Sequence, residues 1–488
     1  MQFFHKYAQQ LNTLVSHVSP HPLRGAKLAV YNTTLGQTLG LPTTLQEETH
    51  LFAALFSESG DLSKNAVAQK YGGHQFGHWN PQLGDGRGLL LGEHISPDGQ
   101  SWDLHLKGAG STPYSRMGDG RAVLRSTIRE YLASEALHHL GIPSSRALCL
   151  ITSEQNVQRE TREPAAMMIR VCQSHIRFGH FEYFHHSQQP EKLQALFDFC
   201  FAHHFSHLSQ RPNKYQALLE QVVLDTAHLI AKWQAYGFNH GVMNTDNMSI
   251  HGITFDYGPY AFMDDFDSGY ICNHTDQYGR YAFEQQPGVG LWNLNAFAHG
   301  FTDYLSTEDI VAALQQYEPT LQAHFEYLMA KRLGLVTAHQ SQDEPLQAPV
   351  QTLIFEWLEQ LNKEGRDYTD IHQRLIDSLS AENTSHISDH FVDSAWAETW
   401  FEQYRTLSVS LGLKTEEQIS MMRACNPVYT LRNHYAQQAI EAAEKGDFDV
   451  FNALLSALQD PFNQRAGLEA FTQLPPDSGK GKALSCSS

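Results

Sequence analysis

The sequence predicts an α+β fold with two lobes, in which a lobe rich in strands comes first and a larger helical region follows. Two observations support this. The densest glycine stretch runs from Tyr71 to Gly120 and contains two strand-like segments, at residues 89–91 and 102–107. Beyond it, glycine and proline become sparse, and long segments have the apolar spacing of helices. We therefore expect strands and turns first and helices later.

The second strand-like segment, residues 102–107, alternates between apolar and polar side chains. One face carries Trp102, Leu104 and Leu106, and the opposite face ends with Lys107. If the apolar face packs in the core, Lys107 points into a cleft or into solvent. A solvated lysine is the simpler interpretation of this residue taken alone.

Two long helices are predicted further along the chain. Residues 124–140 carry apolar side chains at helical spacing, and Gly141 and Pro143 end the helix. Residues 215–236 form a second amphipathic pattern that ends at Gly237. The first helix follows the strand that holds Lys107 and carries two carboxylates, Glu130 and Glu135.

Composition excludes several classes of protein. The 488 residues include 34 Lys and Arg against 53 Asp and Glu, a formal net charge of −19. This balance argues against nucleic-acid binding and against a basic membrane-surface protein. There is no apolar run of membrane-spanning length and no secretory or organelle leader, so we expect a cytoplasmic protein and no membrane partner. The six cysteines form no CxxC pair, which argues against a zinc knot or a disulfide framework.

Three features of the first lobe follow the order that is typical of protein kinases. A glycine-rich turn, Gly84–Gly88 with the sequence GDGRG, precedes the first predicted strand. Lys107 lies on the next strand, and Glu130 or Glu135 lies on the helix after it. In kinases, such a lysine and glutamate pair to orient the phosphates of ATP. Each feature alone also fits an ordinary turn or a solvated side chain.

Two further motifs follow the second long helix. His240–Asn247 (HGVMNTDN) keeps the seven-residue separation between His and Asn of the kinase loop H-R-D-x-x-x-x-N. Asp256–Gly258 (DYG) resembles D-F-G. Asn247 and Asp256 would then bind the divalent metal that accompanies the nucleotide. Five motifs in this order predict a protein kinase-like bilobal fold.

One position departs from the kinase pattern. Val242 stands where a kinase has its catalytic aspartate, and an apolar side chain cannot accept a proton. The chain is therefore inactive, or another carboxylate acts in its place. Asp246, next to Asn247, is the nearest candidate. A base shifted along the loop would meet the nucleotide at a different place, which permits attack at a different phosphorus of the nucleotide.

Longer strings identify the chain as similar to the selenoprotein O family of pseudokinase-type protein adenylyltransferases, and to its bacterial, cysteine-containing members. The resemblance covers nearly the whole chain. The strings are YGGHQFGHW (71–79), NPQLGDGRG (80–88), LKGAGSTPYSR (106–116), GDGRAVLRSTIREYL (118–132), HGVMNTDNMSI (240–250), DYGP (256–259) and NPVYTLRNH (426–434).

The resemblance implies transfer of AMP rather than phosphate. ATP would lie inverted relative to a kinase, so that its α-phosphorus faces a Ser, Thr or Tyr hydroxyl of a protein substrate and pyrophosphate leaves. The alternatives are UTP as the donor, ordinary phosphate transfer, and a non-catalytic pseudokinase scaffold that only binds nucleotide. Mg²⁺ or Mn²⁺ is the expected metal, and a monomer is the expected state, although no motif determines either.

The resemblance also implies roles for individual residues. Asp246 is the catalytic base, Asn247 and Asp256 bind the metal, and Glu130 is the partner of Lys107. The ATP-binding residues implied are Gly84, Gly86, Arg87, Lys107, Asp119, Gly120, Arg170, Arg177 and Asp256. Arg170 and Arg177 would grip the buried end of the triphosphate.

Cysteine and histidine positions raise two further questions. Cys486 occupies the kind of position that holds selenocysteine in some members of the family, and we hypothesise a redox-sensitive disulfide with Cys272. An inert tail thiol is the alternative. The pairs His138–His139, His185–His186 and His203–His204 suggest metal binding, but packed or solvated histidines are the expected interpretation.

These observations divide the chain into five predicted parts. They are an N-terminal extension packed on the first lobe (1–79), a first lobe with nucleotide-binding elements (80–187), a second lobe with the catalytic loop and metal site (188–337), a helical C-terminal extension (338–474), and a flexible redox tail (475–488).

Overall fold

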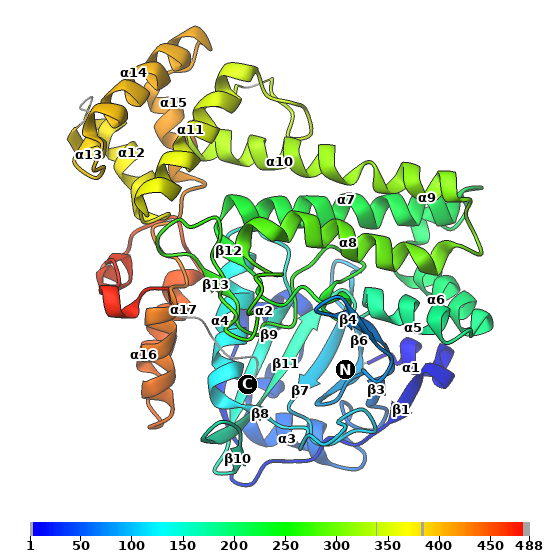
Figure 1. Ribbon diagram of the computed structural model, residues 1–488. Helices are drawn as coiled ribbons and strands as arrows, with labels where there is room; N and C mark the ends of the chain where they lie inside the picture. Colours follow the sequence, from blue (N-terminus) through cyan, green and yellow to red (C-terminus); the bar gives the residue numbers. More distant parts are fainter. Residues whose placement is uncertain (1–2, 338, 382–384, 482–488) are drawn as a thin grey trace.

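A computed structural model describes residues 3–337, 339–381 and 385–481 of the chain (Figure 1). It shows a lobe built on one antiparallel sheet, followed by a region that is almost entirely helical. The predicted α+β fold class is therefore confirmed. None of the helices in the described ranges combines the length and the apolar character needed to cross a bilayer.

The main sheet has nine strands, seven of which follow one path. In spatial order they are β1 (Val15–His17), β3 (Val67–Gln69), β6 (Gly88–Ile95), β7 (Ser101–Lys107), β11 (Arg162–Cys172), β9 (Arg146–Thr152) and β2 (Lys27–Tyr31). β8 (Ala122–Val123) and β10 (Asn156–Gln158) pair with β11 off this path. Two small sheets join β4 (Gly73–Gln75) to β5 (His78–Asn80) and β12 (Phe238–Asn239) to β13 (Ala261–Phe262). Three strands of the main sheet thus come from the first 79 residues.

The helices follow largely in the order that the apolar patterns predict. They are α1 (Lys6–Gln10), α2 (Thr33–Leu39), α3 (Glu48–Phe56), α4 (Leu124–His139), α5 (Phe178–His186), α6 (Pro190–His203), α7 (Lys214–Ala235), α8 (Gln286–Ala298), α9 (Thr307–Leu314), α10 (Tyr317–Arg332), α11 (Ala348–Glu364), α12 (Asp370–Ser380), α13 (Ser385–Ser388), α14 (Ser394–Ser410), α15 (Thr415–Arg423), α16 (Asn433–Ala443) and α17 (Asp449–Leu458). The two predicted long helices, α4 and α7, are confirmed.

Alternation along β7 explains how the sheet is covered. Leu104 and Leu106 pack with leucines of α2 and α3 on one face. The opposite face lies under α4, in a second apolar cluster that includes Met168 of β11. Lys107 therefore faces α4, where it is only 4% exposed, so the solvated interpretation of this lysine was wrong. The period of two that the sequence shows decides which face each side chain takes.

The C-terminal helices divide into two groups (Figure 1). Helices α11 to α15 share a separate apolar core with the end of α10, centred on Trp357 and Trp400. Helices α16 and α17 instead return to the first lobe and pack on α4, where Phe451 lies edge-on to Tyr131. Arg129 of α4 donates to Asn433 Oδ1 at 3.0 Å. The helix that carries Glu130 is thus held from both sides.

The start of the predicted flexible tail is docked on the protein. Pro475 and Gly479 are buried, and Lys480 forms an ion pair with Asp265 at 2.8 Å. Gly479 lies against the ring of His434, where a Cβ atom would come within 2.7 Å of Nδ1. Residues 475–481 are therefore held near the segment that follows the catalytic loop. The domain boundaries stay a prediction.

Candidate active site

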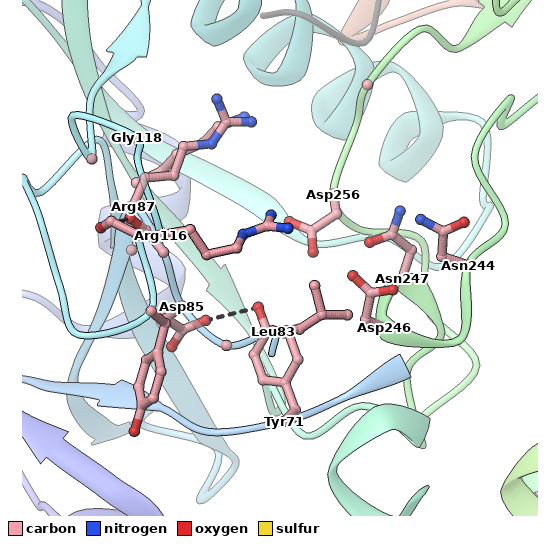
Figure 2. Close-up of a pocket in the computed structure, with 18 of the residues that line it drawn as sticks. Tyr71, Leu83, Asp85, Arg87, Arg116, Gly118, Asn244, Asp246, Asn247 and Asp256 are labelled. Atoms are coloured by element: carbon pink, nitrogen blue, oxygen red, sulfur yellow. Dashed lines mark hydrogen bonds between the residues drawn. The ribbon is translucent and has the colours of Figure 1, made fainter. Parts of the chain in front are cut away.

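A cavity of about 510 Å³ opens between the sheet and the loops that follow α7 (Figure 2). It brings together residues that are more than 170 positions apart in the sequence. The predicted site residues that line it are Gly84, Gly86, Arg87, Lys107, Asp119, Gly120, Arg170, Arg177, Asp246, Asn247 and Asp256. Figure 2 shows Asp246, Asn247 and Asp256 on one wall and Asp85 and Arg87 on the other.

The floor of the cavity is a chain of buried ion pairs. Lys107 Nζ contacts one oxygen of Glu130, and Arg170 Nε contacts the other. Arg170 also reaches Asp256 Oδ1 at 2.5 Å, and Arg177 pairs with Asp256 Oδ2. The structure therefore selects Glu130, not Glu135, as the partner of Lys107. Glu135 instead holds Arg146 at 2.6 Å, away from the cavity.

This chain of charges sets the protonation of its members. Burial lowers the pKa of Lys107 to about 8, and neighbouring Arg87 and Arg170 act in the same direction. Burial alone would raise the pKa of Asp256, but Arg170 and Arg177 hold it well below its usual range. Asp256 is therefore an anion held between two cations, with each of its oxygens paired to one arginine.

The backbone at Asp256 is strained. Its φ of +61° lies in the left-handed region, which a residue with a side chain rarely adopts. The preceding residue, Phe255, is fully buried and lies 4.6 Å from the Arg177 guanidinium. Such a conformation costs about 1–3 kcal/mol and persists only where the surroundings fix it, which is typical of functional sites.

Asp246 lies in a short 3-10 helix, η4 (Thr245–Asn247), beside the floor. Its side chain is buried, and burial raises its pKa to about 7 despite the nearby Arg177. Its Oδ2 is 3.5 Å from Gln75 Nε2, while its Oδ1 has no hydrogen-bond partner among the described residues. A buried carboxylate oxygen that accepts no hydrogen bond destabilises the fold unless a ligand supplies a donor or a cation.

Asn247 and Asp256 fit the predicted metal pair. The amide of Asn247 donates to the Val242 carbonyl at 2.9 Å, which fixes the side chain and leaves its oxygen as an acceptor. Oxygen donors of this kind suit Mg²⁺ and Mn²⁺. The orphaned Oδ1 of Asp246 beside them adds a further oxygen. In this structure Asp256 is engaged by two arginines, so it would have to exchange at least one of them for a metal ion.

The glycine-rich turn is shaped by its lack of side chains. Gly84 has φ of +136°, and a Cβ there would lie 2.6 Å from Tyr114. Gly120, which lies outside this turn but also lines the cavity, has φ of +69°, and a Cβ there would lie 2.1 Å from the backbone of Gly110. Asp85 fixes the turn by accepting from the Gln69 backbone N–H at 3.0 Å. The turn therefore brings backbone close to the cavity, as phosphate binding requires.

Several residues of the cavity were missed by sequence reasoning. Tyr71, Arg116, Arg121 and Asn244 line it but have no counterpart in a kinase motif, and their only signal is that they fall within the strings of the resemblance. Arg159 falls in none of those strings. It forms a two-pronged ion pair with Asp119, both contacts at 2.9 Å, at the rim of the cavity.

The cavity is cationic in an acidic protein. Its lining holds seven Lys and Arg side chains and four Asp side chains, a difference of +3, whereas the whole chain carries −19. Clustered guanidiniums and backbone glycines bind phosphate groups. The lining therefore fits a polyphosphate ligand.

The redox hypothesis stays a prediction. Cys272 is buried beside the catalytic loop, and a Cβ at Gly241 would lie 2.5 Å from its sulfur. Cys486 lies outside the described residues. Peptide mass spectrometry of the oxidised protein tests the pairing, and an unlinked Cys486 peptide would contradict it.

The fold and the cavity together define a class. The chain is an α+β protein in which a strand lysine paired with a helix glutamate, the His240–Asn247 loop and the DYG segment follow the order of kinase motifs and meet at one cavity. The model of the family "Protein adenylyltransferase SelO" matches residues 1–459. The chain belongs to the SelO family.

Relatives of known name match over the full length. A protein of Pseudoalteromonas atlantica named "Protein nucleotidyltransferase YdiU" is 54% identical over 488 residues, covering 100% of both chains. Proteins of the same name from Pseudomonas fluorescens and Yersinia pseudotuberculosis are 48% and 46% identical, covering 100% of this chain and 99% of theirs. The resemblance inferred from the sequence strings is therefore confirmed.

Proposed function

We propose that this chain is a protein nucleotidyltransferase that moves AMP from ATP to Ser, Thr or Tyr hydroxyls of proteins and releases pyrophosphate. The observation that carries the proposal is the position of its carboxylates. Val242 removes the base from the kinase position, and Asp246, buried with a free Oδ1, supplies one further along the loop. The names of the family and its relatives support nucleotidyl transfer.

The polarity of the cavity supports an inverted nucleotide. The buried end holds Lys107, Arg170 and Arg177, which would bind the terminal phosphates and stabilise the charge that develops on leaving pyrophosphate. The α-phosphate would then lie towards η4. Asn247 and Asp256 would hold Mg²⁺ or Mn²⁺, which neutralises phosphate charge. Asp246 would orient the acceptor hydroxyl and take its proton while the oxygen attacks the α-phosphorus.

Two labelled nucleotides separate nucleotidyl transfer from phosphate transfer. With α-³²P-ATP we expect radiolabel on protein, and with γ-³²P-ATP none, because the γ-phosphate leaves in pyrophosphate. Label from the γ position alone would establish a kinase and overturn the proposal. No label from either nucleotide, with ATP still bound, would establish the scaffold. A parallel reaction with α-³²P-UTP compares the two donors.

Substitution of Asp246 by asparagine tests the proposed base. We expect Asp246→Asn to slow transfer by ~10²–10⁴-fold, since a neutral amide cannot accept the proton. ATP affinity should stay within about twofold, because Asp246 faces the acceptor rather than the terminal phosphates. The measurement pairs single-turnover transfer with equilibrium ATP binding. Transfer at the wild-type rate would exclude Asp246 as the base.

A further inference from the structure

A cluster of side chains of the types that bind metal ions lies outside the cavity lining, beside the loop that contains Asp246. His74 of β4 and Glu182 and His186 of α5 place one ligand atom each within 4.8 Å of one another. Glu182 and His186 are four residues apart on one helix, so they share a face. Nothing in the kinase-type motifs uses these residues.

The carboxylate at the centre of this set is incompletely satisfied. Glu182 is fully buried, and its Oε2 contacts His74 Nδ1. Its Oε1 has no hydrogen-bond partner in the described part of the chain. A buried, half-satisfied carboxylate is unfavourable, and a cation held between it and two imidazoles would complete it.

The histidines are available as ligands. His186 carries an imidazole ring, which in its neutral form donates a nitrogen lone pair to a metal ion. Its ring is exposed to solvent, which provides an entry path and room for a bound water. Ligand bonds of about 2.0–2.2 Å need the donor atoms to lie about 3–4 Å apart, so the set would have to contract slightly around an ion.

The set is mechanically connected to the proposed base. The backbone N–H of His74 donates at 2.7 Å to Oγ1 of Thr245, the residue directly before Asp246. Gly73, before His74, lies so close to Asp246 that a Cβ would come within 2.9 Å of Oδ1. At the other end of α5, Arg177 donates to the Asp246 carbonyl at 2.6 Å. An ion joining β4 to α5 would fix both elements that surround Asp246.

We propose that His74, Glu182 and His186 bind one Zn²⁺ ion, separate from the nucleotide metal, that fastens the β4–β5 hairpin to α5 beside the catalytic loop. Two imidazoles and a carboxylate form a donor set typical of zinc, with a fourth position open to water. The same donors disfavour Mg²⁺, which prefers oxygen ligands. Asn247 and Asp256 offer only oxygens and suit the hard nucleotide metal.

The test measures zinc binding rather than transfer. Full-length protein is stripped with a chelator and titrated with Zn²⁺ by calorimetry in excess Mg²⁺, without nucleotide. We expect one Zn²⁺ per chain, and a weakening of ~10²-fold or more in His186→Ala. His186 is exposed, so this variant should fold. The neighbouring His185→Ala is the matched control and should bind as the wild type does.

A second cluster, His228, His324 and Asp343, provides the competing outcome. Its carboxylate is 48% exposed, which makes it the weaker candidate. If His228→Ala loses the zinc and His186→Ala keeps it, the ion binds there and the proposal is wrong. It is equally wrong if stripped wild-type protein takes up no Zn²⁺. Co²⁺ absorption of the wild type and of His186→Ala gives a second readout of coordination by imidazole.

Discussion

We expect the replacement of Asp256 by asparagine to abolish transfer while the protein still binds ATP. The carboxylate joins Arg170 and Arg177, and it is one of the two expected metal ligands. Asparagine keeps the shape but removes the charge, so metal binding and the alignment of both arginines fail. We expect a loss of ~10³-fold or more in single-turnover transfer.

The same substitution makes the cavity more cationic. ATP binding measured without a divalent ion should therefore be retained or strengthened, which a merely unfolded variant would not show. Asp265→Asn is the control, since Asp265 lies outside the cavity and pairs with Lys480. That variant should transfer normally. An Asp256→Asn enzyme within tenfold of the wild-type rate would show that this carboxylate does not organise the reaction.

Glu130→Gln is expected to reduce both stability and nucleotide binding. Glu130 is fully buried and neutralises Lys107 and Arg170 at once. Its loss leaves two buried cations without their shared anion, and breaking such a buried pair costs about 3–5 kcal/mol. The free energy of unfolding, from denaturant titration, should fall by about that amount. ATP affinity should fall too, since Lys107 loses its orientation.

Glu135→Gln provides the matched comparison on the same helix. Glu135 is also fully buried, but it binds Arg146 and the Asn32 amide instead of the cavity lysine. We expect a similar loss of stability with ATP affinity unchanged in the folded protein. If both variants lost ATP affinity equally, the effect would come from α4 as a whole, and a specific role for the Lys107–Glu130 pair would be excluded.

Much of the site could be predicted because its motifs are local. The turn at Gly84–Gly88, the loop ending at Asn247 and the DYG segment each depend on a few adjacent residues with fixed backbone requirements. Strand alternation also placed Lys107 opposite the leucine face. Its burial could not be predicted, because the neutralising carboxylate, Glu130, comes from α4, 23 residues further along the chain.

The histidines show the opposite case. From the sequence alone, His185–His186 was expected to be a packed or solvated pair rather than part of a metal site. Glu182 and His186 share a helix face, but the third ligand atom comes from His74, over a hundred positions earlier. Only the packing of β4 on α5 brings it there. Likewise, Arg159 joins the cavity rim solely because its hairpin reaches Asp119.

The sequence by itself determined the α+β class, the order of the motifs, the valine at the kinase base position and the family, since periodicity and short motifs are properties of neighbouring residues. The tertiary structure decided which glutamate pairs with Lys107, which carboxylate oxygens lack donors, and that α16 and α17 return to support α4. These depend on contacts between distant segments. Burial then decides the free-energy cost of each charged side chain. A charge removed from water is stabilised only by the few groups that the fold places beside it.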